Sequence, residues 1–166
     1  MPNIIINAIK LTGTYEDLET ARAYLLQPLF GTRLGLACAK ATQNPTAENP
    51  VADFKDAVFN AHWATLDIGE AVLSYTTAWT PSDVINAAVS KVAESYGVQP
   101  GDHLAITETI LNETPNFWRN GHLSQFKEAD SRILMKTGFL DISPTFQKAV
   151  NDGLTRLERT SGHRAA

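Results

Sequence analysis

Residues 50–79 read PVADFKDAVFNAHWATLDIGEAVLSYTTAW, and the fold class depends on how this stretch is interpreted. Steps of three and four residues from Val51 reach mostly apolar or aromatic side chains, as on the buried face of a helix. This row consists of Val51, Phe54, Val58, Ala61, Thr65, Ile68, Val72, Tyr75 and Trp79. Pro50 suits a first helical turn, and Thr80-Pro81 ends the stretch. The pattern predicts one long central helix over residues 50–79.

The segments around this stretch predict more helices and a single clear strand. Asn3–Leu11 (NIIINAIKL) is short and β-branched, which favours a strand. Residues 29–41 are ambiguous, with a helix favoured, and residues 43–50 read as a loop. Further helices are expected where capping residues or prolines precede apolar periodicity. Those starts are Thr14, Thr80-Pro81, Ser124 and Ser143-Pro144, with the third helix ending at Lys136 near Gly138.

These elements predict a mainly α fold, a single domain over residues 1–166 with about six or seven helices around the central one. Residues 1–13 would form an N-terminal strand or arm, and residues 161–166 a loose tail. The stretch 103–111 (HLAITETIL) is rich in β-branched residues and fits either a helix or a strand. The alternative fold is therefore α+β, with residues 3–11 paired to residues 103–111.

Composition is ordinary for a soluble globular protein, at 43% hydrophobic and 19% charged residues. No apolar run approaches the ~20 residues that span a bilayer, so no membrane partner is expected. The N-terminal residues do not read as a signal peptide. Cys38 is the one cysteine and has no partner for an intrachain disulfide. We therefore expect a cytoplasmic or otherwise reducing compartment rather than secretion.

Charge is distributed unevenly along the chain. Residues 1–118 carry six Lys/Arg and thirteen Asp/Glu, a balance of −7, whereas residues 119–166 carry eight and five, a balance of +3. Such polarity suits contacts within one fold or head-to-tail contacts between copies. Val89–Thr107 imitates a helix-turn-helix, but Lys91 is its one cation. DNA binding needs several phosphate contacts, so DNA is not an expected partner.

Histidines are the first candidates for chemistry. His62 lies on the predicted central helix beside aromatic residues, where an imidazole could ligate a tetrapyrrole iron or line a ligand pocket. A histidine in such a position is more commonly half exposed at the margin of the helix and binds no ligand. His103 and His122 fall in or near turns, with Asp102 close to the former, so an acid–base site is conceivable. No recognised catalytic spacing supports it.

Other catalytic and metal-binding patterns are missing from the sequence. The four histidines are scattered, and with one cysteine they give no zinc spacing. Cys38 lies among apolar residues, which would raise its pKa rather than activate the thiol. Neither a nucleophile elbow nor a phosphate-binding glycine loop occurs. We therefore predict no catalytic residue, no metal site and no cofactor, and an enzyme is the less favoured interpretation.

Phe117, Trp118 and Arg119 form the most interesting surface candidate, because aromatic residues and Arg are enriched at interface hot spots. They are equally compatible with a loop that folds back and fills the core with Trp118. Arg156 and Arg159 add to the basic C-terminal part of the chain. These five residues are the predicted interface.

Three functions are consistent with these observations. The first is a non-catalytic assembly subunit of a multi-subunit complex, such as a virus-like or phage-like particle, whose partners are copies of itself or other protein subunits. The second is a helical ligand-binding or tetrapyrrole-binding protein with a pocket beside His62. The third is a small enzyme that uses His103 or His122.

Overall fold

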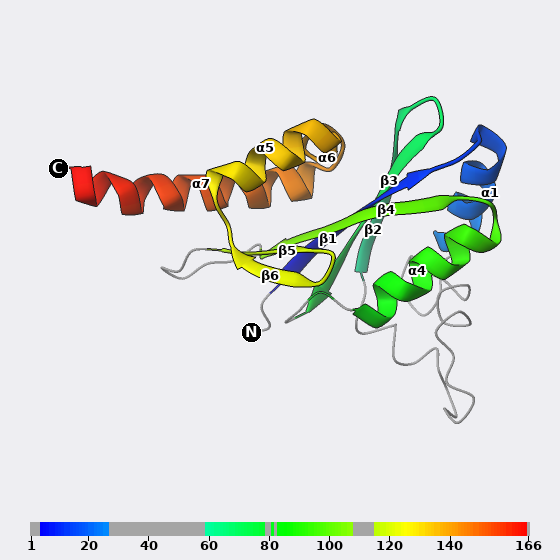
Figure 1. Ribbon diagram of the computed structural model, residues 1–166, viewed down its shortest axis with the longest axis horizontal. Coiled ribbons are helices and arrows are strands. Elements are labelled where there is room, and N and C mark those ends of the chain that lie inside the picture. The colour runs from blue at the N-terminus through cyan, green and yellow to red at the C-terminus, as the bar shows by residue number, and fades with distance from the viewer. Residues whose placement is uncertain (1–3, 27–58, 79–80, 82, 108–114, 166) are drawn as a thin grey trace, which may run out of the picture.

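The structure is a computed structural model that describes residues 4–26, 59–78, 81, 83–107 and 115–165 (Figure 1). Its strands are β1 (Ile4–Thr12), β2 (Phe59–Asp67), β3 (Glu70–Ala78), β4 (Gln99–Thr107), β5 (Asn116–Arg119) and β6 (His122–Gln125). Its helices are α1 (Tyr15–Leu25), α4 (Asp83–Ser95), α5 (Glu128–Thr137), α6 (Phe139–Ile142) and α7 (Pro144–Ala165).

The described strands form one antiparallel sheet in the order β2-β3-β1-β4-β5-β6. Strand β3 lies between β1 and β2, and α1 and α4 occupy the two connections of the series β1-α1-β2-β3-α4-β4. This order is that of the split β-α-β, or ferredoxin-like, arrangement. The β5–β6 hairpin extends the sheet beyond β4. The fold is therefore α+β, and the predicted mainly α bundle is wrong.

The predicted central helix is a β-hairpin over its described part. Residues 59–78 form β2 and β3, which are joined by a turn at Ile68-Gly69. Gly69 has a φ of +80°, a conformation that costs glycine little and other residues more. Thr65, Thr76, Thr77 and the aromatic residues nearby also favour strands. Residues 50–58 lie outside the described part of the chain, as do residues 29–41, Cys38 and the predicted loop 43–50.

The helical periodicity was misleading because both faces of β3 are covered. Val72 packs with the residues of α5, α6 and α7, whereas Leu73 and Tyr75 pack on the side of α1 and α4. A strand that is buried on both faces shows a continuous apolar run instead of an alternating one. Three-and-four spacing then selects apolar residues by coincidence.

The N-terminal strand is the centre of the sheet and not an arm. β1 pairs with β3 along Ile4–Thr12 and with β4 on its other side. The alternative prediction, residues 3–11 paired with residues 103–111, agrees with the pairing of Ile5–Ile9 with His103–Thr107. Residues 108–111 lie outside the described chain. β1 is therefore paired on both sides and is not free to pair with a neighbouring molecule.

Two helical layers cover the sheet, one on each face (Figure 1). Helices α1 and α4 pack on one face through Leu18, Leu25, Val89 and Val92, against Ile9 and Leu73. Helices α5, α6 and α7 pack on the other face, where Phe126, Phe139 and Phe146 are fully buried with Ile6 and Ile106.

Several helix starts match the sequence predictions because caps are local signals. The Thr14 hydroxyl accepts a hydrogen bond from the Asp17 backbone N at 3.1 Å and begins α1. Ser143 likewise accepts from the Phe146 backbone N at 3.3 Å at the start of α7. The helix predicted from Ser124 begins instead at Glu128, because His122–Gln125 is strand β6. Helix α7 continues through Ala165, across the expected tail.

Candidate interaction surfaces

The β5–β6 hairpin carries most of the predicted interface residues. Its two-residue turn is Asn120-Gly121, and both residues have positive φ, 52° and 84°. Two positive φ values define the type I′ turn, whose twist matches that of the flanking strands and which Asn-Gly favours. Phe117, Trp118 and Arg119 therefore lie on strand β5 and not in a loop.

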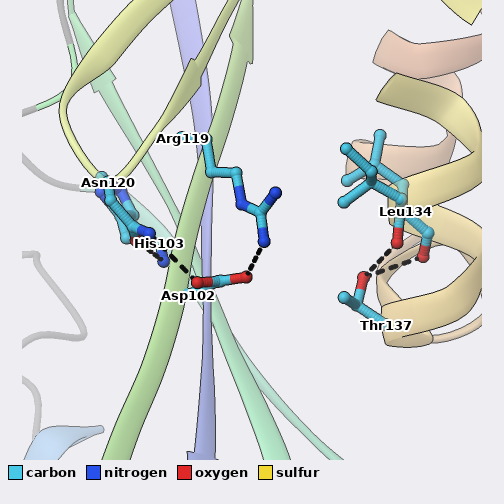
Figure 2. Close-up of polar contacts among 7 residues, drawn as sticks. Asp102, His103, Arg119, Asn120, Leu134 and Thr137 are labelled. Atoms are coloured by element: carbon cyan, nitrogen blue, oxygen red, sulfur yellow. Dashed lines mark hydrogen bonds and ion pairs between the residues drawn. The ribbon is translucent and has the colours of Figure 1, made fainter. Parts of the chain in front are cut away.

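Polar contacts fix this hairpin to β4 (Figure 2). The Asn120 side-chain oxygen accepts from the His103 backbone N at 2.9 Å, and the Asn120 backbone N donates to the His103 carbonyl at 2.8 Å. The Asn120 amide also donates to Asp102 Oδ1 at 3.0 Å. The Arg119 guanidinium donates to Asp102 Oδ2 at 2.8 Å. The hairpin is held on the sheet at its tip as well as along its strand.

These contacts change the acidity of Asp102. The hydrogen bond from Asn120 and then that from Arg119 lower the pKa of the Asp102 carboxyl group below its ordinary value, and partial burial opposes them. Asp102 therefore stays ionised, and Arg119 is paired within its own chain.

Strand β6 is an open edge of the sheet. All four of its residues are exposed, and Leu123 retains 61% of its surface. The Phe126 backbone N donates to the Pro115 carbonyl at 2.8 Å, so Phe126 directs its backbone groups towards the preceding strand. By the alternation of an antiparallel strand, Leu123 and Gln125 direct theirs outward. None of the residues of β6 is an Asp, Glu, Lys, Arg or Pro.

The opposite edge, β2, is protected. Its register with β3 shifts twice, between Phe59 and His62 and between Thr65 and Asp67. Such irregularities interrupt strand pairing and are one of the ways in which proteins block sheet edges. The Leu66 side chain also packs closely on Gly138, at the end of α5. The two edges of the sheet therefore differ in their capacity to accept another strand.

An apolar groove lies between α1 and the β2–β3 turn, and we call it the α1–hairpin groove. It encloses about 340 Å³ and is lined by Tyr15, Leu18, Glu19, Trp63, Thr65, Asp67, Ile68, Gly69 and Ala71. Ile68 is 97% exposed and Tyr15 is 70% exposed, although both are large and apolar. The turn is held in place because Gly13 N donates to the Gly69 carbonyl at 3.0 Å. Exposed apolar side chains around a fixed groove indicate a contact surface.

Met135 on α5 is another exposed apolar residue, at 66%. Arg132 precedes it by one helical turn and Lys136 follows it directly, and both are exposed. Met135 thus lies in a basic surround, on the helical layer opposite to that of α1.

The predicted interface residues divide into buried and exposed ones. Phe117 packs on the side of α5–α7 and Trp118 packs with Ile5 and Ala105, and they are 2% and 8% exposed. Both fill the core of their own chain, which was the other interpretation of these residues. Arg119 is exposed and bonded to Asp102. A contact of these residues with a partner stays a prediction.

Arg156 and Arg159 both lie on α7. Arg156 is half-buried, and burial lowers the pKa of its guanidinium group while Asp152 opposes that shift. Arg159 is exposed. Figure 1 shows that the C-terminal end of α7 extends beyond the sheet. The two arginines therefore lie on the outer layer of the molecule, and their role at an interface stays a prediction.

His62 and His122 are both exposed strand residues. His62 lies on β2, opposite Ser74, and not on a helix, and the neighbouring Trp63 lines the α1–hairpin groove. His122 begins β6, opposite Arg119. Strand β5 separates His122 from His103, so the sheet does not bring these two histidines onto neighbouring strands. The ligand pocket beside His62 and the enzyme that uses His103 or His122 stay predictions.

His103 is a buried polar residue, 2% exposed, in the middle of the sheet. Its Nε2 lies 2.9 Å from Asn7 Oδ1. The Asn7 amide nitrogen donates to the carbonyl oxygens of Ile5 at 3.3 Å and Tyr75 at 3.4 Å, besides Thr77 Oγ1 at 3.0 Å. Because carbonyl oxygens only accept, the amide oxygen of Asn7 faces His103, whose Nε2 must then donate. The Tyr75 ring lies parallel to the imidazole, with centroids 6.4 Å apart. This cluster joins β1 to both neighbouring strands.

Within the described ranges, no group of three or more His, Cys, Asp or Glu lies close enough to hold a metal ion. Of the helices that the structure describes, none has the length and apolarity needed to cross a membrane. Comparison of the chain with protein-family models, curated proteins and solved structures gives no match.

Proposed function

We propose that this protein is a non-catalytic assembly subunit that associates with copies of itself through the β6 edge. The observation that carries the proposal is the contrast between the edges of the sheet. The pairing of β2 with β3 is irregular at two places and Leu66 of β2 packs on Gly138, whereas β6 is exposed and contains no Asp, Glu, Lys, Arg or Pro. Native proteins normally block an open edge with charges, proline or bulges. An edge without these devices suits the addition of another strand.

The backbone directions of β6 specify the register of such a pairing. Leu123 and Gln125 direct their backbone groups outward, so they exchange hydrogen bonds across an antiparallel contact. Leu123 of one copy then lies opposite Gln125 of the second copy, and Ser124 meets Ser124 on the two-fold axis. This contact is isologous, because each copy uses the same surface. No like charges of β6 face each other in this register.

Strand β6 has only four residues, so this contact alone is small. Short edge strands pair weakly. We therefore expect dimers that form as the protein concentration rises, and a second contact in any larger assembly. The compartment belongs to the proposal as well: we assign the protein to a reducing, cytoplasmic-type compartment on the strength of its single cysteine.

Leu123→Pro tests the proposal. Proline removes the outward N–H of Leu123, which has no partner in β5 by the alternation described above, so the hairpin itself retains its bonds. We expect a dimer mass for the unchanged protein at high concentration and high salt, and a dimerisation weakened roughly tenfold or more in the variant. Sedimentation equilibrium measures both.

His62→Lys is the matched control, because it alters an exposed residue of the protected edge. This variant should dimerise like the unchanged protein. Circular dichroism confirms that each variant is folded. Unchanged dimerisation of Leu123→Pro, or a monomer at every concentration of the unchanged protein, would contradict the proposal.

A further inference from the structure

The two helical layers differ in charge. The acidic and basic parts of the sequence therefore lie, in part, on opposite faces of the sheet. Helices α1 and α4 contain five Asp/Glu and two Lys/Arg. Residues 127–165, which form the opposite layer, contain seven Lys/Arg and five Asp/Glu. Copies that stack with opposite layers in contact would therefore attract each other.

The acidic layer carries the α1–hairpin groove. Its lining is mainly apolar and includes Trp63 and Leu18, and Glu19 and Asp67 also line it. A side chain that enters this groove should be apolar, and its neighbours should be cationic. A flexible thioether suits such a site particularly well, because it contacts aromatic rings favourably.

The basic layer carries a residue with these properties. Met135 is exposed by 66%, and Arg132 and Lys136 lie beside it on the surface of α5. Leu134 of the same helix packs on the sheet face opposite to that of Trp63 and Leu18. The groove and Met135 thus belong to opposite layers, so a contact between them joins two different molecules.

We propose that Met135 of one copy inserts into the α1–hairpin groove of the next copy, with Arg132 and Lys136 near Glu19 and Asp67. The occupant of the groove is therefore a second copy of this chain. The contact is heterologous, because it joins different surfaces, and it repeats into rings or filaments. The inference rests on the proposed assembly function and adds to it the contact that the short β6 edge requires.

The test uses two double variants in which Leu123→Pro removes the β6 pairing. One also carries Met135→Asp, which disables the inserting residue, and the other carries Ile68→Asp, which disables the groove. Both second positions are exposed, so both variants should fold. Leu123→Pro alone should form assemblies that dissociate as salt is raised, because exposed charges are screened over ~8 Å at physiological salt.

Each double variant alone should be monomeric at low salt, whereas an equimolar mixture should form heterodimers. In that mixture the Met135→Asp variant supplies an intact groove and the Ile68→Asp variant supplies an intact Met135, so each pair of molecules forms one contact. Light scattering and sedimentation give the masses. A mixture that stays monomeric, or assembly by either double variant alone, would overturn the inference.

Charge reversal supplies a second and independent measurement. On the Leu123→Pro background, Glu19→Lys and Arg132→Glu should each weaken assembly about fivefold or more, and the two together should restore it. If each single variant assembles like the Leu123→Pro protein and the combination brings no gain, the proposed contact is also overturned.

The two proposals fail in different ways. If the heterologous contact is wrong and the β6 pairing is right, the unchanged protein forms dimers that resist salt, and Leu123→Pro is monomeric. If the β6 pairing is wrong and the heterologous contact is right, Leu123→Pro and the unchanged protein form the same salt-sensitive assemblies.

Discussion

Asn120 and His103 are joined by a reciprocal pair of hydrogen bonds: the Asn120 side chain accepts from the His103 N–H at 2.9 Å, and the Asn120 N–H donates to the His103 carbonyl at 2.8 Å. A turn residue thus completes the backbone hydrogen bonding of a strand that it does not belong to. Its left-handed backbone, with a φ of 52°, places both groups towards β4.

We expect Asn120→Ala to destabilise the protein by about 2–3 kcal/mol, because it removes the side-chain bonds and because alanine tolerates the left-handed backbone conformation less well than asparagine does. Asn120→Gly removes the same bonds without the conformational penalty, so it should cost about 1 kcal/mol less. Urea denaturation measures both differences. Equal stability of the two variants would show that the backbone conformation contributes nothing.

Acid should weaken the attachment of the hairpin through Asp102. The pKa of this carboxyl group is lowered in the folded chain by Asn120 and Arg119. A folded pKa below the unfolded value of about 3.9 stabilises the protein above that value, and the stabilisation is lost as the pH falls through the folded pKa. We expect Asp102→Asn to be less stable than the unchanged protein at pH 7, with a difference that shrinks in acid.

Denaturation midpoints across a pH series test this expectation. Asp141→Asn, an exposed change on α6, serves as the control. A stability difference for Asp102→Asn that is constant from neutral pH into acid would contradict the argument.

Val72→Asp and Ile68→Asp distinguish the hairpin from the helix that the sequence predicts. On the helix both residues would lie on one buried face, but here Val72 is 1% exposed and Ile68 is 97% exposed. Val72→Asp should cost several kcal/mol or unfold the protein, because it buries an unpaired charge. Ile68→Asp should stay within about 0.5 kcal/mol at low protein concentration. Thermal melts of both variants measure the loss of stability. A similar loss of stability at both positions would support the helix.

Asn7 should be one of the least replaceable residues of the sheet. Asn7→Ala removes the acceptor for His103 Nε2 and the donor to Thr77, both buried, at a cost of roughly 2–4 kcal/mol. Asn7→Asp keeps the acceptor but directs a carboxylate oxygen at the carbonyls of Ile5 and Tyr75, so it should be no better at pH 7. Lys10→Ala, on the same strand, should cost under ~1 kcal/mol. Guanidinium denaturation of the three variants provides the comparison.

Local signals in the sequence predicted what local chemistry determines. Thr14 and Ser143 begin helices because a side-chain oxygen satisfies backbone N–H groups within the same few residues. Gly138 ends α5 in a left-handed conformation, with a φ of 78°. The strand at residues 3–11 was also predicted, from its β-branched composition.

The arrangement of these elements depends on contacts between distant parts of the chain. The apolar pattern of residues 59–78 wrongly predicts a helix, because helices cover both faces of β3 and leave it a continuous apolar run. Two turn signals were present: Gly69 after Asp67-Ile68, and the Asn120-Gly121 pair, which is the strongest short-range signal for a hairpin.

The interaction surfaces were only partly accessible to sequence reasoning. Arg119 and His103 could be named, but the role of Asn120 depends on the register of β4 with β5. The exposure of Tyr15, Ile68 and Met135 depends on which side of each element faces the core. Apolar residues are normally assigned to the core, so an exposed one is visible only in the folded molecule.

The central position of β1 has a consequence for the kinetics of folding. Asn7 lies 68 residues before Tyr75 and 96 residues before His103, yet it contacts both. Loop closure over such separations is entropically costly, and proteins rich in distant contacts fold slowly. During synthesis the isoleucine-rich strand β1 leaves the ribosome before β3 and β4. It therefore stays unpaired until these strands have been synthesised. In this interval the nascent chain exposes a β-branched, apolar segment of the kind that promotes aggregation.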